Sequence, residues 1–295
     1  MILVAGGTGL LGSRVVGQLV ERGERVRVLT RDPRRAAHLP AGVQTMVGDV
    51  RRGPLDSVVE GCSSVVSAVH GFTGPTRTNP AAVDRDGNHH LIAAATRAGV
   101  DRFVLVSGVD ARPDHPMSLH RMKHAAEQDL RGAVLPGVIV RATCFLETWL
   151  DVIGTKIAVG GAALVLGPGR NPINFVSADD VAAFVRLAVS GDERIGAEVS
   201  VGGPQNLTFI EIAQRLLAGT GRTDRIRHVP LSALRALSVL ARPISPDFAR
   251  RAGAAVVMNT TDMTFDAAPV RDLFPEIDPT TIAQLTDPLS CGRAR

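Results

Sequence analysis

The sequence contains no tyrosine, and several other residue types are scarce. One tryptophan and nine phenylalanines leave few rings to stack on nucleobases, which disfavours binding of single-stranded nucleic acid. The three cysteines, Cys62, Cys144 and Cys291, lie far apart and form no CxxC pair. We therefore expect neither a disulfide framework nor a metal site, and such cysteines fit a reducing compartment.

Membrane and export signals are also missing. No apolar run approaches the ~20 residues that span a bilayer, and an apolar segment starts at Met1 without a basic leader. We expect a cytoplasmic protein without a membrane partner. The net charge of +4 comes almost wholly from arginine, since Lys123 and Lys156 are the only lysines. Because these cations are interspersed with acids, we expect no specific nucleic-acid partner.

The most informative feature that is present lies at the start of the chain. Gly6, Gly9 and Gly12 recur at every third position between an apolar segment at 1–5 and an amphipathic segment at 9–22. Glycines between a strand and a helix let the backbone approach a pyrophosphate, which the N–H groups at the helix start can bind. The alternative is a plain tight turn, but this context favours a dinucleotide.

Apolar runs alternate with helical patterns through the first half of the chain. The runs lie near 26–29, 43–47, 65–69, 103–106 and 138–140, and the helical patterns near 54–60, 80–98 and 118–131. This alternation predicts an α/β fold, a doubly wound parallel sheet with its ligand at the carboxyl ends of the strands. We expect residues 1–150 to form the dinucleotide-binding Rossmann domain. Residues 151–295 are expected to complete the sheet and to form a smaller, substrate-facing lobe, with a helical stretch at 231–258 broken by prolines.

Short motifs along nearly the whole chain form a recognisable set. They are Gly6–Gly12, Leu29–Arg31, Gly48–Val50, Val104–Ser107, Lys123 with Glu127, Val140–Arg141 and Gly202–Pro204. Together they resemble the NmrA-like group of atypical, extended short-chain dehydrogenases/reductases. The resemblance implies a Rossmann fold and an NAD(P) cofactor, acting on a small-molecule substrate. A homodimer is left open, and the motifs say nothing about the identity of the substrate.

The resemblance also implies which residues would hold the cofactor, namely Gly6, Thr8, Gly9, Leu10, Leu11, Gly12, Arg31, Asp49, Val50, Ala68, Val69, His70, Ser107 and Lys123. Arg31 can fork onto a 2′-phosphate and lie on the adenine, with charge added by Arg34 or Arg35. NADP(H) is therefore the preferred cofactor. Asp32 is the counter-argument, because a carboxylate there could bind the ribose of NAD(H) instead.

Several of these residues have structural alternatives. Arg31 could be a solvated arginine, and Asp49 could hold an Asx-type turn. His70 could be an ordinary loop histidine. Lys123, which we expect to hold the nicotinamide ribose, could be an exposed helix lysine.

The missing tyrosine removes the usual chemistry of the superfamily that the chain resembles. In that chemistry a tyrosine four positions before a lysine donates a proton as hydride arrives. Here Leu119 stands four positions before Lys123. The remaining catalytic candidates are Ser107, Lys123 and His120, the last lying one turn before Lys123 on the same helix face.

Other polar residues near these candidates have weaker claims. His120 itself could be a surface histidine, and Asp110 and His115 are further proton donors to consider. Arg141 could face an anionic substrate group, but we expect it to form an ion pair with Glu127 or Glu147.

Three functions fit the sequence. The first is an NADPH-dependent oxidoreductase that transfers hydride to a conjugated carbonyl, a quinone or a similar acceptor, where no tyrosine is required. The second is a non-catalytic NAD(P) redox sensor. The third is a biosynthetic enzyme that uses the bound nicotinamide for a net non-redox step.

Overall fold

The computed structural model describes residues 1–72, 79–155, 157, 161–218 and 225–286 of the chain. Contacts divide the chain into two units, each with its own buried core. Unit 1 comprises Met1–Ala142 and Ala178–Val201, and unit 2 comprises Thr143–Ser177 and Gly202–Arg295. Cys291 lies outside the described residues. No helix in the described part of the chain has the length and apolarity that crossing a bilayer requires.

Unit 1 is built on a seven-stranded parallel sheet with the order β10-β6-β5-β4-β1-β2-β3. The strands are β1 (Ile2–Ala5), β2 (Val26–Thr30), β3 (Gln44–Val47), β4 (Ser64–Ser67), β5 (Arg102–Gly108), β6 (Gly137–Ala142) and β10 (Glu198–Val201). Every residue of β1 and β4 is buried, as strands covered on both faces require. The strand order reverses between β1 and β4, where such sheets bind ligands. The predicted doubly wound α/β fold is confirmed.

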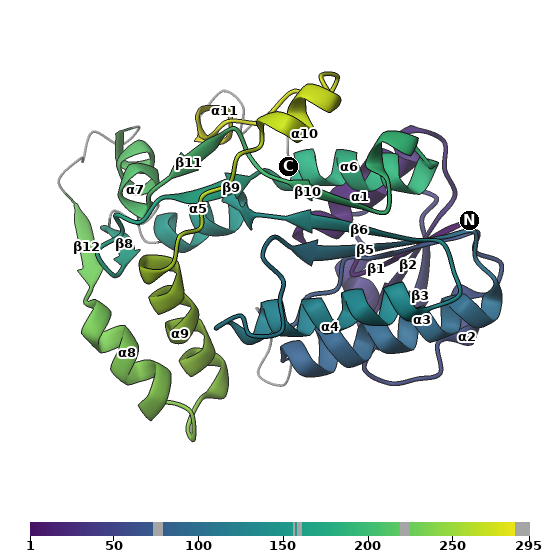
Figure 1. Cartoon of the computed structure of the whole chain (residues 1–295), viewed down its shortest axis with the longest axis horizontal. Coiled ribbons are helices and arrows are strands. Elements are labelled where there is room, and N and C mark those ends of the chain that lie inside the picture. The colour runs from purple at the N-terminus through teal and green to yellow at the C-terminus, as the bar shows by residue number, and fades with distance from the viewer. Residues whose placement is uncertain (73–78, 156, 158–160, 219–224, 287–295) are drawn as a thin grey trace. The chain divides into compact units, whose positions relative to one another are not determined.

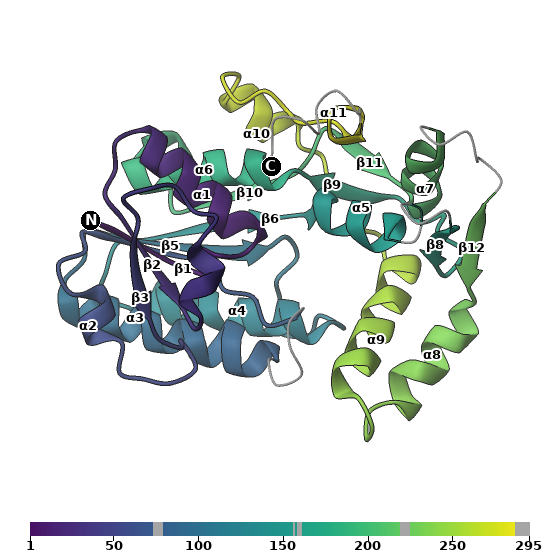
Figure 2. The ribbon, with the colours of Figure 1, turned by 180° about the vertical axis from the view of Figure 1, so that it is seen from behind.

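Helices cover both faces of this sheet. Figures 1 and 2 show α1 (Leu10–Glu21) and α6 (Ala178–Ser190) on one face, and α2 (Asp56–Val59), α3 (Asp86–Ala98) and α4 (Ser118–Gly132) on the other. Gly99 ends α3 in the left-handed conformation, with φ 64°. A five-residue π-helix, η2 (Ala81–Arg85), precedes α3 where a continuous α-helix was expected. Short 3₁₀ helices follow β2, at η1 (Pro33–Ala36), and α6, at η3 (Glu193–Ile195).

The sheet of unit 1 is completed by a segment from the second half of the chain. β10 pairs in parallel with β6, with Glu198 opposite Ile139 and Val201 opposite Ala142. Without β10, β6 would be an edge strand with unpaired backbone groups. Residues 178–201 therefore belong to unit 1 through both α6 and β10.

Unit 2 contains two small sheets and six helices among its described residues. β7 (Cys144–Phe145), β9 (Ile173–Val176) and β11 (Gln205–Leu207) form one sheet, and β8 (Ala163–Leu166) pairs in parallel with β12 (Ile226–Val229). The helices are α5 (Leu146–Gly154), α7 (Phe209–Ala218), α8 (Leu231–Leu240), α9 (Pro246–Thr260), α10 (Ala268–Leu273) and α11 (Ile282–Thr286). The break predicted within 231–258 is confirmed, because α8 ends at Leu240 and α9 begins at Pro246.

Candidate active site

Two glycines of the turn from β1 into α1 have no room for a side chain. Gly6 has a φ of +84°, and a Cβ atom there would lie 2.5 Å from the carbonyl oxygen of Ala68. A Cβ atom on Gly12 would lie 2.2 Å from the carbonyl oxygen of Gly6. Both obstacles are backbone atoms, which cannot rotate away. Glycine is therefore required at Gly6 by the packing against the end of β4, and at Gly12 by the packing against Gly6.

Gly9 has a different role. Its backbone is extended, with φ −91° and ψ 178°, and no side chain caps α1 behind it. A Cβ atom on Gly9 would have Gly6 O as its nearest neighbour, at 3.3 Å. The first N–H groups of the helix, at Leu10, Leu11 and Gly12, have no acceptor within the helix. A pyrophosphate fits this place, since the missing Cβ and the uncovered N–H groups leave room for an anion beside Thr8 and Gly9.

The end of β2 carries positive charge. Arg31, Arg34 and Arg35 are exposed, and none of them forms an ion pair with an acid in the described part of the chain. Asp32 instead accepts a hydrogen bond of 3.0 Å from the backbone N–H of Arg34 and so caps η1. One oxygen of the carboxylate that could have bound a ribose is thus engaged by a backbone donor.

Asp49 follows β3 and holds an Asx-type turn, the structural alternative to a role at the adenine. Its Oδ1 accepts from the backbone N–H of Arg51 at 3.0 Å, and its Oδ2 lies 2.5 Å from the Arg51 guanidinium. The hydrogen bond from Arg51 lowers the pKa of this carboxyl, and the nearby charge of Arg31 acts in the same direction. The adjacent Val50 accepts a 2.9 Å hydrogen bond from His90 Nδ1 at its carbonyl oxygen.

The end of β4 runs beside the glycine loop. Ala68 donates its N–H to Ala5 O at 2.9 Å, so this segment continues the ladder of the sheet past β4. Val69 is buried and His70 is exposed, with its ring centroid 6.2 Å from that of Phe72. The sheet thus brings Ala68 and Val69 next to Gly6, and their expected contact with the cofactor stays a prediction.

Lys123 is a buried residue, only 6% exposed. Its Nζ donates to Val69 O at 3.0 Å and to Val106 O at 2.9 Å, and forms an ion pair with Asp84 Oδ1 at 3.0 Å. An ammonium group has three protons, and three oxygen atoms already surround this one. The expected role of Lys123 at the nicotinamide ribose stays a prediction. In that role, Nζ would exchange one of these three oxygen contacts for a ribose hydroxyl.

Sequence reasoning missed the partners of Lys123. Asp84, on η2, is fully buried and also accepts from Gly71 N–H at 2.9 Å. Asn88 is fully buried too: its side-chain amide donates to Asp84 O at 2.6 Å, and its oxygen accepts from Ser67 Oγ. These groups connect the carboxyl ends of β4 and β5 to η2 and α3. In the sequence, the one sign of these partners is that an acid, Asp84, interrupts the apolar run after Pro80.

Ser107, near the end of β5, lies close to a buried ion pair. Glu127 is fully buried and receives two hydrogen bonds from Arg141, at 2.9 and 2.7 Å. Burial acts to raise the pKa of Glu127, but the contacts from Arg141 and Ser107 outweigh it and lower that pKa. The expected ion pair of Arg141 with Glu127 is confirmed. Ser107 Oγ is itself buried and has no hydrogen bond of good geometry within the described structure.

His120 stacks on His115 next to the end of β5. The two ring centroids are 4.1 Å apart at an interplanar angle of 22°, and a Cβ atom on Gly108 would lie 3.3 Å from His120 Nε2. His115 Nε2 lies 3.6 Å from Asp110, which adopts a left-handed φ of 63°. Burial, together with the neighbouring His115, lowers the pKa of His120 to about 3. At neutral pH His120 is therefore uncharged, and its Nδ1 is buried without a hydrogen-bond partner in the described structure.

Replacing His120 by leucine is expected to make unit 1 more resistant to acid. An unfolded chain protonates this imidazole near pH 6.5, whereas the folded chain does so near 3. Between these values only the unfolded state gains the proton, so stability falls as the pH falls. From pH 7 to 4.5 this one group costs about 3 kcal/mol, which the His120→Leu variant should not lose. Urea unfolding at both pH values measures it, with exposed His38→Leu as control; equal acid losses in the two variants would contradict the burial of His120.

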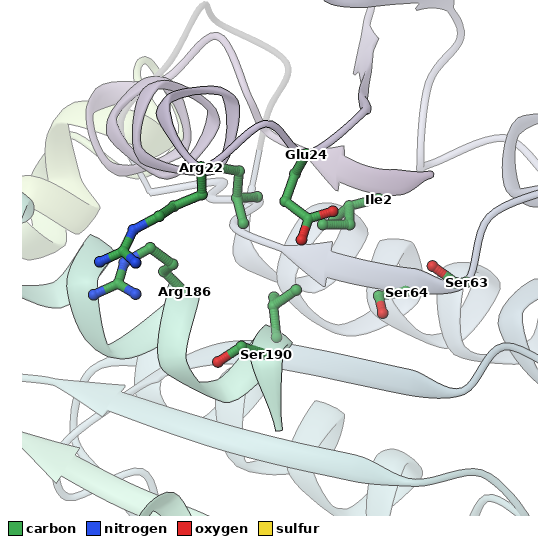
Figure 3. Close-up of a pocket in the computed structure, with 9 residues that line it drawn as sticks. Ile2, Arg22, Glu24, Ser63, Ser64, Arg186 and Ser190 are labelled. Carbon is green, nitrogen blue, oxygen red and sulfur yellow. The ribbon is translucent and has the colours of Figure 1, made fainter. Parts of the chain in front are cut away.

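A cavity of about 520 Å³ lies at the amino ends of the strands of the same sheet. Its lining includes Ile2 and Ser64, the first residues of β1 and β4, whereas the glycine loop follows the last residue of β1. Figure 3 shows Arg22 and Arg186 on one side of it and Ser63 and Ser64 on the other. Doubly wound sheets bind their ligands at the carboxyl ends of the strands, so this cavity is separate from the candidate site.

Comparisons with known proteins agree with this geometry. Residues 6–190 match the model of a family described as NAD(P)H-binding. The NAD(P)H azoreductase of Xenophilus azovorans is 31% identical over 83% of this chain and 83% of its own length. The Photosystem II assembly factor Ycf39 of Synechocystis is 29% identical over 92% and 85%. Among solved structures, the NADPH-dependent quinone oxidoreductase of Escherichia coli, complexed with NADPH, has a TM-score of 0.77 at 20% identity, covering 97% of this chain and 98% of that one. The expected NAD(P) cofactor and the resemblance to NAD(P)-binding reductases are confirmed.

Proposed function

We propose that this chain, which belongs to the NAD(P)H-binding family, is an NADPH-dependent reductase of conjugated acceptors such as quinones, enones or azo compounds. The observation that carries the proposal is the pairing of a glycine loop, which leaves space at the uncapped start of α1, with polar groups at the ends of β4 and β5 that include no strong proton donor. The sequence has no tyrosine, Lys123 is held by three oxygen atoms, and His120 is neutral.

Such acceptors suit this arrangement of residues. Bound NADPH supplies the hydride. The negative charge that arrives with it spreads over a conjugated acceptor onto an oxygen or nitrogen, so protonation need not be simultaneous with hydride transfer. Two groups would hydrogen-bond to that atom. They are Ser107 Oγ, which contacts Glu127 without a hydrogen bond of good geometry, and His120 Nδ1, which is buried without a partner in the described structure. Two of the similar proteins, the azoreductase and the quinone oxidoreductase, are named for the reduction of acceptors of this kind.

The preference for NADPH over NADH rests on the charges after β2. Arg31, Arg34 and Arg35 are exposed there, and the Asp32 carboxylate is held by the N–H of Arg34. A 2′-phosphate would meet guanidinium groups, whereas the ribose hydroxyl of NADH would meet a carboxylate of which one oxygen already accepts a hydrogen bond.

Arg31→Ala is therefore expected to weaken NADPH binding by about tenfold or more, with little effect on NADH, because only NADPH carries the 2′-phosphate. Fluorescence titration of the reduced nicotinamide with both cofactors measures this. Arg25→Ala, at an exposed arginine before β2, is the matched control and should change neither affinity. Equal losses for NADPH and NADH would remove Arg31 from the 2′-phosphate site.

The reductase activity is tested by following the loss of NADPH absorbance with a panel of quinones, enones, imines and azo dyes. Turnover is expected with at least one class, and the Ser107→Ala with His120→Leu double variant should lower kcat more than it raises the Kd of NADPH. A protein that binds NADPH tightly but reduces no member of the panel would overturn the proposal.

A second candidate function is a non-catalytic NAD(P) sensor. The similarity to an assembly factor over 92% of the chain favours it, as does an ammonium already held within the protein. A sensor should bind oxidised and reduced cofactor with clearly different affinities and show no turnover. Equal affinities together with turnover decide for the reductase.

A further inference from the structure

Large apolar side chains are exposed to solvent around the turn between α8 and α9. Exposed fractions are 56% for Val239, 71% for Leu240, 87% for Ile244 and 49% for Phe248. Half of the eight exposed large hydrophobic residues found in the described structure thus lie within ten residues of sequence. We call these four side chains the hairpin tip. In both Figure 1 and Figure 2 this turn forms the far end of the α8–α9 hairpin, away from β8 and β12.

The hairpin itself is well packed, so the exposure is confined to its tip. Leu234, Ala252 and Ala255 are buried between the two helices and contact Leu166 and Val229 of the neighbouring strands. Ser245 caps α9 by accepting from Phe248 N–H at 3.4 Å. Folding of the hairpin therefore leaves Ile244 and Phe248 outside its buried apolar cluster and largely or half exposed.

The charges around the tip are mostly positive. Residues 231–260 contain four arginines and a single acid, Asp247, which pairs with Arg250 at 2.6 Å. The other three, Arg235, Arg242 and Arg251, are exposed. An occupant of this surface must therefore offer both an apolar layer and negative charge.

We propose that the hairpin tip docks on an anionic lipid surface. Apolar side chains at a convex end can enter the boundary between headgroups and acyl chains, while the arginines stay at the phosphates. A second copy of the chain would bring the same arginines to an isologous contact, where like charges oppose one another. An apolar run that spans a bilayer is not needed for such peripheral docking. The inference does not rest on the reductase proposal, since vesicle binding is measured without turnover.

Flotation of the full chain with phosphatidylcholine vesicles, with and without phosphatidylglycerol, tests this proposal. We expect binding to the anionic vesicles at low salt, and much weaker binding to neutral vesicles or at high salt. Leu240→Asp with Ile244→Asp should lower the partition coefficient at least tenfold. Arg242→Gln should lower it about fivefold. Unchanged circular dichroism and NADPH titration would show that these variants fold.

Matched controls lie in unit 1. Val134→Asp replaces a side chain that is 93% exposed, and Arg25→Gln removes an exposed arginine; neither should alter vesicle binding. The proposal fails if the wild type binds no vesicles, if it binds neutral vesicles equally well, or if the controls lose as much as the tip variants. It also fails if light scattering shows a dimer that Ile244→Asp dissociates, which would make a second copy the occupant.

Discussion

Replacing Asp84 with alanine is expected to lower the free energy of unfolding by about 3–5 kcal/mol, because it leaves a charge without its partner inside the protein. Lys123 is 6% exposed and Asp84 fully buried, with 3.0 Å between Nζ and Oδ1. The alanine also removes the acceptor of the Gly71 N–H. Urea unfolding followed by circular dichroism measures the loss. A variant as stable as the wild type would show that the pair is not formed in solution.

A double variant separates charge pairing from cofactor binding. Asp84→Asn with Lys123→Met removes both charges and nearly keeps both side-chain volumes, so we expect it to recover most of the stability that either single change loses. If the ammonium of Lys123 only links β4 and β5, the double variant should bind NADPH as tightly as the wild type. If the ammonium also holds the nicotinamide ribose, its affinity should fall about tenfold or more.

The two buried ion pairs of unit 1 show what the sequence could and could not predict. The pair between Glu127 and Arg141 was predictable, because α4 leads directly into β6 and the two residues are 14 positions apart. The pair between Asp84 and Lys123 joins segments on either side of β5 and depends on η2. A π-helix adds a residue to its turn, which changes the face on which Asp84 lies. The 3.6-residue periodicity predicted one continuous helix over 80–98, and this pattern carries no information about a π-helical turn at its start.

The same distinction holds for the rest of the chain. Apolar runs and capping residues are local signals, and they predicted six of the seven strands of the parallel sheet and the glycine loop. Residues 151–295 were expected to complete the sheet, but no local signal identified residues 198–201 as the strand that pairs with β6. The stacking of His115 on His120 likewise depends on how the segment after β5 folds back.

Replacing Gly9 with aspartate is expected to lower NADPH affinity more than 100-fold while leaving the fold intact. Asp is among the best N-cap residues, and its charge suits the helix start, so stability should stay equal or rise by about 0.5 kcal/mol. The carboxylate would take the N–H groups that a pyrophosphate needs and would repel it. The extended backbone of Gly9 accepts a side chain with a shift of only a few tenths of an ångström, since the nearest atom lies 3.3 Å from the Cβ position.

Two further glycines of the same region make the result specific. Gly12→Ala would set a Cβ atom 2.2 Å from Gly6 O, so it should lose stability as well as affinity. Gly17, on the same helix, has no atom within 4 Å of its Cβ position, and Gly17→Asp adds the same charge without touching the loop. Titration with NADPH and urea unfolding of all three variants compare them. An affinity loss for Gly17→Asp as large as that for Gly9→Asp would mean that charge alone, and not the space at the helix start, governs binding. A loss confined to Gly9 and Gly12 places the pyrophosphate where α1 begins, with Gly12 required by the loop and Gly9 by the ligand.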